Sequence, residues 1–355
     1  MAGERVAGSP GVTGGLEILP VHGIGDVMPG DDLAGLIVGA APWLRDGDIL
    51  VVTSKIVSKA EGRLVEVPAD GPERDAAREE ALAAETARVV ARRGATAIVQ
   101  THHGFVMAAA GIDASNIDKT HLVLLPADPD ASARALRAAL AARGLAVGVI
   151  VSDTMGRAWR NGLTDVALGA AGIGPLRDHR GEIDPYGNEL HLTEMAVIDE
   201  LAAAGELVKG KCERVPVAVV RGYPGTGPAD GPGAAALIRD PASDMFSLGT
   251  AEARAAGLRD AACLPDAPRG GGAADPAAVA RALAAVGDLL APGTQVSEAP
   301  GTLRCAAPDD SPAALLRLGA DVHRIRAALA AEGLGSATAI DGTALILTLT
   351  GPARL

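Results

Sequence analysis

The sequence predicts an α+β protein, with a mixed-sheet domain followed by a small C-terminal α/β segment. Strand-like apolar runs alternate with helical patterns over roughly the first 220 residues. Some of the links between them are too short for the regular right-handed crossovers of an all-parallel sheet. The stretch PDAPRGGGAAD (265–275), rich in Gly, Pro and Ala, then separates the main body from the C-terminal segment.

Five apolar segments in the main body are expected to be strands, because each is short, apolar and bounded by turn residues. The first is closed by the turn HGIGD, and the second follows the turn RDGD. The segments are LEILPV (16–21), ILVVTS (49–54), AIVQT (97–101), AVGVIVS (146–152) and VPVAVV (215–220).

Four segments have the apolar spacing of helices. The first follows PGDDL, where Asp31 or Asp32 can cap the helix, and runs to about Leu44. The last covers 192–211, with Thr193 as its expected cap. The two between them cover 71–94, which contains no helix breaker, and 131–144, which ends in glycine.

The domain boundaries follow from these patterns. Residues 1–15 lack the apolar core of a signal sequence and are expected to form a disordered tail. The main domain is expected over 16–253 and a linker over 254–275. The C-terminal segment, 276–355, is expected to contain a helix, a polar loop, a second helix and a strand.

Composition excludes several classes of function. The formal net charge of -12 argues against a nucleic-acid surface, which needs clustered cations. No apolar run approaches the ~20 residues that span a bilayer, so no membrane anchor is expected. The three cysteines lack metal-ligand spacing and leave an odd thiol, which favours a reducing compartment and a cytoplasmic location.

The stretch VIVSDTMGRAWRN (149–161) contains the strongest candidates for chemistry. Asp153 and Thr154 follow an apolar run, and a glycine turn is expected before Arg157, Trp159 and Arg160. An acidic strand end next to two arginines suits a metal with an anionic ligand. Trp159 could pack against a planar ring or only wedge the loop.

Other polar residues also follow strands. Lys55 and Lys59 come after ILVVTS, and Asp113 lies in the loop AGIDASNID (110–118). Hard cations such as Mg²⁺ prefer one or two carboxylates together with substrate phosphates. The alternatives are two solvated lysines, and aspartates that act only in an Asx-turn or a helix cap.

Several other kinds of site are excluded by the motifs that the sequence lacks. HGIGD could present backbone N–H groups to a phosphate, but no GxxxxGK[ST] loop occurs. The histidines form no HxxxH or HxH pair, so a zinc site is not expected. No GxSxG elbow is present and no cysteine has an obvious histidine partner, which leaves covalent acyl chemistry without a nucleophile.

Four motifs in preserved order resemble the coenzyme F420:L-glutamate ligase (F420-0:gamma-glutamyl ligase) family. The similarity runs from about Leu16 to Ala253. It is especially close to the ligase half of an actinobacterial two-domain enzyme, whose other half is a flavin-binding nitroreductase-like domain. The motifs are VVTSKIVSKAEGR, HGFVMAAAGIDASN, VSDTMGRAWRNGLTDVALGAAG and DPYGNELHLTEMAVIDELA with the following LVKGK.

The resemblance implies an enzyme that uses GTP to attach L-glutamate to coenzyme F420-0 through an acyl-phosphate intermediate, and that can add further γ-linked glutamates. It implies Mg²⁺ or Mn²⁺, with K⁺ as an additional candidate cation, and an intertwined homodimer. Phosphoryl transfer relies on positioning and charge neutralisation more than on covalent catalysis. The alternatives are a metal-dependent phosphohydrolase and an inactive deazaflavin-binding protein.

The resemblance also implies roles for individual residues. Asp113 and Asp153 would hold one divalent cation and Thr154 a second. With the metal ligands so placed, Asp153, Arg157 and Arg160 are the expected catalytic residues, and the two arginines would neutralise phosphates or the acidic acceptor. The implied nucleotide-binding residues are Ile24, Gly25, Asp26, Val27, Ser54, Lys59, Asn116, Arg221, Gly222 and Tyr223.

The C-terminal segment is expected to bind no FMN. It resembles fragments of the nitroreductase-like domain, with only a short loop, SEAPGTLRCAAPDDSPAA, where those relatives have a long stretch. The segment has scattered arginines and no aromatic residue, whereas an FMN site needs phosphate contacts and a broad apolar wall. The alternative is an unrelated small domain that helps the chain to dimerise or covers the active site.

Overall fold

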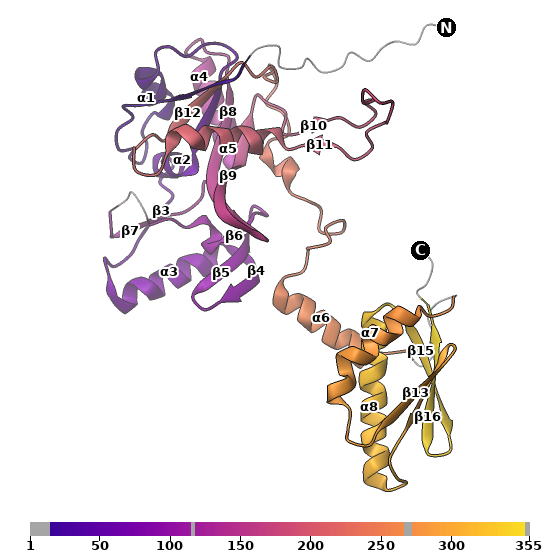
Figure 1. Ribbon diagram of the computed structural model, residues 1–355. Helices are drawn as coiled ribbons and strands as arrows, with labels where there is room; N and C mark the ends of the chain where they lie inside the picture. Colours follow the sequence, from indigo (N-terminus) through magenta and orange to yellow (C-terminus); the bar gives the residue numbers. More distant parts are fainter. Residues whose placement is uncertain (1–14, 115–117, 266–271, 352–355) are drawn as a thin grey trace. The chain divides into compact units, whose positions relative to one another are not determined.

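The computed structural model describes residues 15–114, 118–265 and 272–351. The chain divides into two compact units, Met1–Gly249 (unit 1) and Thr250–Leu355 (unit 2), shown in Figure 1. The predicted nucleotide ligand Asn116 and nearly all of the expected N-terminal tail lie outside the described residues.

A mixed sheet forms the centre of unit 1, as the sequence predicts. Its fifth strand, over 160–171, was not predicted, and the strand expected at 97–101 lies in a smaller sheet. The strand order of the central sheet is β1-β12-β2-β8-β9. β2 and β8 are parallel and the other neighbours are antiparallel, so the sheet places the end of β2 beside the middle of β8. The strands are β1 (Glu17–Pro20), β2 (Ile49–Thr53), β8 (Gly148–Arg157), β9 (Arg160–Ala171) and β12 (Val217–Arg221).

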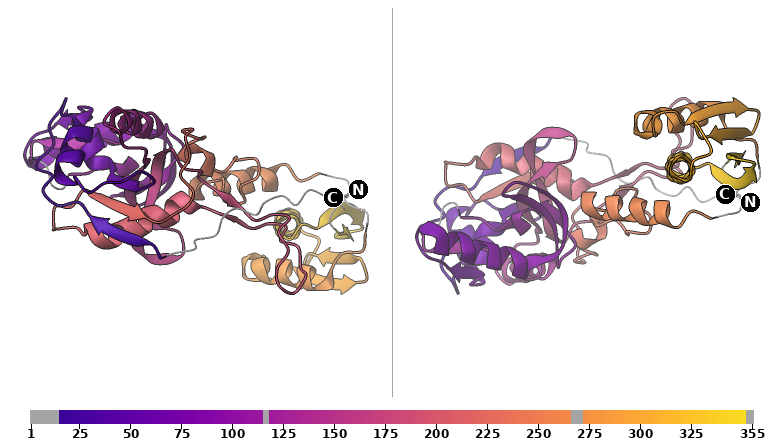
Figure 2. Two further views of the ribbon diagram at one scale, coloured as in Figure 1. Left: turned by 90° about the horizontal axis from the view of Figure 1, so that it is seen from above. Right: turned by 90° about the horizontal axis from the view of Figure 1, so that it is seen from below.

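Helices cover both faces of this sheet (Figure 2). Val149 and Val151 of β8 pack toward α1 (Leu33–Ala40), α2 (Ser54–Ala60) and α4 (Pro129–Ala141). Ile150 instead packs with α5 (Val197–Lys209) on the opposite face. Alternate residues of β8 therefore face different helices, as the two-residue period of a strand requires.

Two smaller sheets complete the described part of unit 1. One pairs β3 (Leu64–Glu66) with β7 (His121–Val123). The other has the order β4-β5-β6, and its strand β6 contacts β8. Its strands are β4 (Thr86–Arg93), β5 (Thr96–Thr101) and β6 (Val106–Ala108), followed by the 3-10 turn η1 (Ala109–Gly111).

The helix predicted over 71–94 is wrong in its second half. Helix α3 ends at Glu85, and the chain continues as β4. The segment TARVVARR contains β-branched residues that favour a strand, and Gly94 at φ 58° allows the tight return into β5. Pairing with β5 therefore overrides the helical pattern of the sequence.

The cap predicted for the last helix of the main domain is also wrong. α5 begins at Val197 with Ala196 at its N-cap. The carbonyl of Thr193 instead accepts the backbone N–H of His179 at 2.9 Å. This bond belongs to an arm in which β10 (Arg177–Asp178) pairs with β11 (Glu194–Met195).

The predicted strand end at Asp153 does not exist. β8 continues through Gly156 to Arg157 and returns as β9 through a tight turn at Ala158 and Trp159, the latter at φ 57°. Asp153 is half-buried in the middle of a long strand. The antiparallel partner β9 supplies the backbone bonds that keep MGR extended where the sequence suggested a glycine turn.

Unit 2 has a four-stranded antiparallel sheet of order β13-β14-β16-β15. Its core lies between this sheet and two helices, α7 (Pro276–Val286) and α8 (Pro312–Ala331). The strands of this sheet are β13 (Gln295–Ala299), β14 (Thr302–Ala306), β15 (Gly335–Asp341) and β16 (Ala344–Thr350). Unit 2 also contains α6 (Thr250–Ala262) and the 3-10 turn η3 (Gly287–Leu289), while a further 3-10 turn, η2 (Ala234–Leu237), belongs to unit 1.

Two details of the C-terminal region differ from the sequence prediction. Helix α6 occupies the first part of the segment expected to be a linker. The expected polar loop contains β14 and the end of β13, joined in a hairpin. Backbone pairing across the sheet thus gives regular structure to a segment whose polar composition suggested a loop.

Candidate active site

The candidate site forms around three consecutive residues of β8. Asp153 follows Val151 on the face toward α2, whereas Ser152 and Thr154 follow Ile150 on the face toward α5. The strand therefore delivers a carboxylate to one side of the sheet and two hydroxyls to the other. These two sides have different electrostatic environments.

Asp153 is a carboxyl group in an unfavourable position for negative charge. Burial above all, and then the neighbouring carboxylates Asp165 and Asp113, raise the pKa of Asp153 to about 7. The backbone N–H of Thr154, which donates to Oδ1 at 2.8 Å, and the ammonium of Lys55 act in the opposite direction. A half-buried carboxyl group near two others fits a cation, because a bound positive charge would relieve this repulsion.

Asp113 is the second carboxylate on this side. Its backbone is fixed by an isolated bridge to Val123, with N–H to O distances of 3.0 and 2.8 Å in the two directions. Its Oδ2 lies 2.6 Å from Nζ of Lys55, in the first turn of α2. The structure thus brings Asp113 and Asp153 into one electrostatic environment, as the sequence predicts, and adds Lys55 to it.

On the α5 side lies a buried ion pair that sequence reasoning missed. Lys209 and Asp165 are 2% and 3% exposed, and Nζ of Lys209 lies 2.8 Å from Oδ2 of Asp165. The hydroxyls of Ser152 and Thr154 donate to the same carboxylate at 2.9 and 2.7 Å. These partners hold the pKa of Asp165 below its usual value despite burial.

Weak signals for this pair exist in the sequence. Asp165 interrupts the small and apolar run LTDVALGAA, and Lys209 ends an apolar helix at LVKGK. A charged group inside an apolar pattern needs a partner, since burying it alone is costly. Because the two residues are 44 positions apart in the sequence, residue type alone did not show that they are partners.

Thr154 is also bonded to a second lysine. Nζ of Lys211 donates to Oγ1 of Thr154 at 2.7 Å and lies 2.5 Å from Oε1 of Glu206. Glu206 in turn approaches Lys209, with Oε2 and Nζ 3.3 Å apart. Two carboxylates and two ammonium groups therefore form one network around Thr154.

The predicted phosphate-binding residues lie in and before α2. Ser54 begins this helix and is buried, while Lys59 is half-buried in its last turn. Ile24 and Val27 are buried in the core, whereas Gly25 and Asp26 are exposed. Any contact of Ile24 or Val27 with a nucleotide must therefore come from the backbone.

The predicted Arg221–Tyr223 segment is tied to the scaffold. The guanidinium of Arg221 donates to both carboxylate oxygens of Asp48, at 2.8 and 2.7 Å, and stacks over Trp43 at 5.5 Å. Gly222 has a φ of 94°, which favours glycine. Tyr223 packs against the core on the α5 side, and burial raises its pKa. These contacts give Arg221 a structural role at the end of β12.

The two predicted arginines lie away from Asp153 along the hairpin. Arg157 and Arg160 are exposed, and Nη2 of Arg157 donates to the carbonyl of Asn161 at 3.3 Å. Arg157 is four residues beyond Asp153, roughly 13 Å along an extended strand. Trp159 is 83% exposed and packs on Phe246, with ring centroids 5.0 Å apart.

A cavity of about 290 Å³ adjoins the same hairpin. Met155 lines it, two residues beyond Asp153 on the same side of β8, together with Phe105 and Phe246. Arg239 and Asp199 are among its polar lining residues, and burial raises the pKa of Asp199. The cavity therefore combines aromatic side chains with charged ones, and one of its lining residues lies two positions beyond Asp153.

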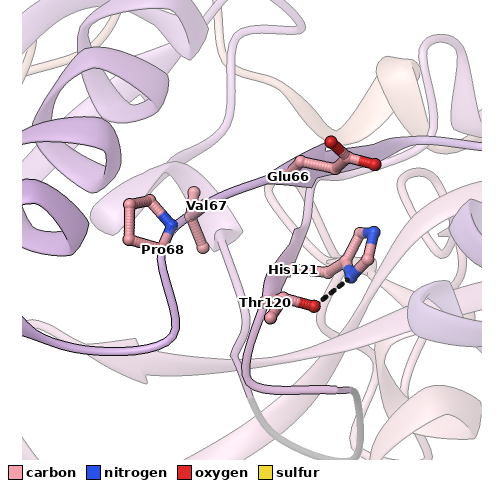
Figure 3. Close-up of a pocket in the computed structure, with 5 residues that line it drawn as sticks. All are labelled: Glu66, Val67, Pro68, Thr120 and His121. Atoms are coloured by element: carbon pink, nitrogen blue, oxygen red, sulfur yellow. Dashed lines mark hydrogen bonds between the residues drawn. The ribbon is translucent and has the colours of Figure 1, made fainter.

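A second cavity, of about 490 Å³, lies at the β3–β7 sheet and is shown in Figure 3. Glu66, Val67, Pro68, Thr120 and His121 line it, and the hydroxyl of Thr120 lies 3.0 Å from Nδ1 of His121. None of the residues predicted from the sequence lines this cavity. Its size alone does not make it the site of chemistry.

Among the described residues, no three acidic, histidine or cysteine side chains gather in a way that could hold a metal alone. Asp113 and Asp153 still suit Mg²⁺ or Mn²⁺, because such ions are commonly held by one or two carboxylates plus substrate phosphates. Thr154 suits a second cation less well, since its hydroxyl already bonds to Asp165 and Lys211.

Comparison with known proteins identifies the family. Residues 23–222 match the family described as F420-0:Gamma-glutamyl ligase. The chain belongs to this family. It is 42% identical over 251 residues to the coenzyme F420:L-glutamate ligase of Methanothermobacter thermautotrophicus, covering 65% of this chain and 99% of that protein. The protein of the same name from Methanopyrus kandleri is 40% identical over 246 residues, covering 65% and 97%.

Membership of this ligase family confirms the resemblance stated from the sequence motifs, and the chain is therefore an enzyme of the ligase class. Within the described part of the chain, no helix has the length and apolar character needed to cross a membrane. The homodimer, the cytoplasmic location and the roles of individual site residues stay predictions.

Proposed function

We propose that this enzyme attaches L-glutamate to the deazaflavin coenzyme F420-0, at the expense of GTP, in coenzyme F420 biosynthesis. The observation that supports this most is the carboxylate pair Asp153 and Asp113 beside Lys55 of α2. A nucleotide polyphosphate and an acidic acceptor both carry negative charge. Bringing the two together needs fixed positive charge, which a cation held by the two carboxylates would supply together with Lys55.

The reaction forms and breaks bonds in two steps. The acceptor carboxylate attacks the γ-phosphorus of GTP, and the bond to the β-phosphate oxygen breaks to release GDP. The amine of L-glutamate then attacks the acyl carbon, phosphate leaves, and the amine proton passes to solvent or a nearby base. The products are an amide, GDP and phosphate, and each further glutamate would need one more GTP.

Residues of this chain supply binding and charge for these steps. Asp113 and Asp153 would hold Mg²⁺ or Mn²⁺, which when bound screens the negative charge of the phosphates. Lys59 offers a cation in α2, and the backbone of 24–27 lies in an adjacent loop that packs on the same core. Arg157 and Arg160 are exposed on the hairpin, where they can attract an acidic acceptor.

The aromatic cavity beside Met155 suits the ring of the acceptor. Phe105 and Phe246 offer apolar contact to a planar ring, while Arg239 offers a cation for an acidic group. Met155 is about 7 Å along the strand from Asp153, a span that an extended side chain of the acceptor can cover. This placement would bring the acceptor's carboxylate toward the proposed cation.

The experiment is an incubation of the full chain with GTP, Mn²⁺, L-glutamate and F420-0, followed by mass spectrometry of the acceptor and a free-phosphate assay. A stepwise gain of glutamate residues, with one phosphate released for each, supports the ligase. Phosphate release without any acceptor would instead indicate a phosphohydrolase. No change in either would indicate a binding protein, and a matched Asp153→Asn reaction shows that a gain depends on this site.

A further inference from the structure

The hydroxyl of Thr154, predicted to ligate a second divalent cation, is already bonded to two side chains. Its Oγ1 donates to Oδ1 of Asp165 at 2.7 Å and accepts from Nζ of Lys211 at 2.7 Å. A hydroxyl has one proton and two lone pairs, so a single lone pair is left next to an ammonium group. A divalent cation at that lone pair would lie close to a positive charge.

The charges around Thr154 are balanced without any added ion. Asp165 and Glu206 contribute two carboxylates, and Lys209 and Lys211 contribute two ammonium groups. Each carboxylate lies within 3.3 Å of at least one ammonium nitrogen. Bringing a dication here would add repulsion from two cations without a free carboxylate to offset it.

The other face of β8 has the opposite character. There Asp153 is half-buried near Asp113, and among the described residues its Oδ1 accepts a neutral backbone N–H, that of Thr154. Lys55 forms an ion pair with Asp113 on this face. A cation therefore gains most beside Asp153 and least beside Thr154.

We propose that Lys211 supplies the positive charge at Thr154 that a second divalent cation was expected to supply, so that the site takes one divalent cation, beside Asp113 and Asp153. The proposal deepens the proposed function, because it rests on the same nucleotide-dependent site. The Lys211 side chain is 62% exposed, so its ammonium can reach a phosphate or acidic acceptor while it occupies this position.

The test counts bound metal and does not depend on turnover. Full-length protein saturated with a non-hydrolysable GTP analogue is dialysed against Mn²⁺, and bound Mn²⁺ per chain is measured. Wild type is expected to bind one Mn²⁺, and Lys211→Gln two, because the substitution removes the competing charge. Lys211→Arg keeps the charge and is expected to bind one, as is Arg254→Gln, which removes an exposed cation of α6.

Two results would overturn the proposal: two Mn²⁺ per chain in wild type, or one in Lys211→Gln with its circular dichroism spectrum unchanged. The failure of the proposed function looks different. An acceptor that gains no mass would refute the ligase reaction and leave the metal count intact. Two bound Mn²⁺ with normal mass gain would refute the role of Lys211 alone.

Discussion

Replacing Lys209 with Met should destabilise unit 1 strongly. The substitution keeps most of the apolar stem, so it creates little empty space, but it leaves the carboxylate of Asp165 buried without its ammonium partner. Among the described residues, the hydroxyls of Ser152 and Thr154 then remain as its side-chain donors. Removing one partner of a buried pair costs about 3–5 kcal/mol, and we expect a loss of that size.

Tryptophan fluorescence during urea unfolding measures this loss in the correct unit. The chain has two tryptophans, Trp43 and Trp159, and both belong to unit 1, so unfolding of unit 2 does not contribute directly to the signal. The double variant Lys209→Met with Asp165→Asn removes the buried charge, and its amide oxygen still accepts from one hydroxyl while its NH2 group can donate to the other. It should recover most of the lost free energy of unfolding.

The loss of free energy of unfolding in Lys209→Met should depend on pH. In wild type the pKa of Asp165 lies below 3.8, so its contribution to stability is present above that pH and is lost as the pH falls further. Without Lys209, desolvation dominates and raises the pKa, so the variant loses stability as the pH rises above about 4. The gap between the two proteins should therefore be widest near neutrality. An unchanged urea midpoint, or a double variant as unstable as the single one, would refute the reasoning.

Three further predictions concern function. Asp153→Asn should abolish Mn²⁺ binding and most activity. In metal-free buffer at pH 8 it should melt at or above the wild-type temperature, because a pKa of about 7 means that Asp153 of the wild type carries an unfavourable buried charge at that pH. A much lower melting temperature would make Asp153 a structural residue. Lys59→Ala should raise the GTP concentration needed for half-maximal rate and lower turnover, because it removes a point charge from the proposed phosphate site; unchanged kinetics at limiting GTP would contradict that role. Purified protein should be colourless and retain no flavin absorbance after FMN is added and the excess removed, and a stoichiometric yellow complex would show that unit 2 or another site binds FMN.

Four strands of the central sheet were predictable because each has a local signal, whereas the fifth, β9, was not predicted. Runs such as ILVV and VAVV are apolar on both faces, which is typical of strands covered by helices on each side. The length of β8 was not predictable, since MGR has no strong strand propensity. Pairing with β9 determines its conformation, and that pairing depends on residues further along the chain.

The site was predictable in part for a similar reason. Asp113 and Asp153 follow apolar runs closely, so the sequence indicated both, and the motifs of the family reinforced them. The connection of Lys55 to Asp113 and of Lys209 to Asp165 spans long stretches of sequence. Such pairs depend on which helix packs on which face of the sheet, and residue type alone does not encode that choice.

The two-residue period of β8 explains how one short segment can serve two purposes. Ser152 and Thr154 face a network that is fully compensated in charge, which favours stability and a fixed strand position. Asp153, between them in sequence, lies on the other side of the strand, where burial and neighbouring carboxylates disfavour its negative charge, which favours a bound cation. The hydrogen bonds of Ser152 and Thr154 therefore fix the backbone of β8, and this backbone positions the Asp153 carboxylate on the other face. Substitutions at Lys209 should therefore act mainly on stability, and substitutions at Asp153 mainly on metal binding, although both side chains lie near the same strand.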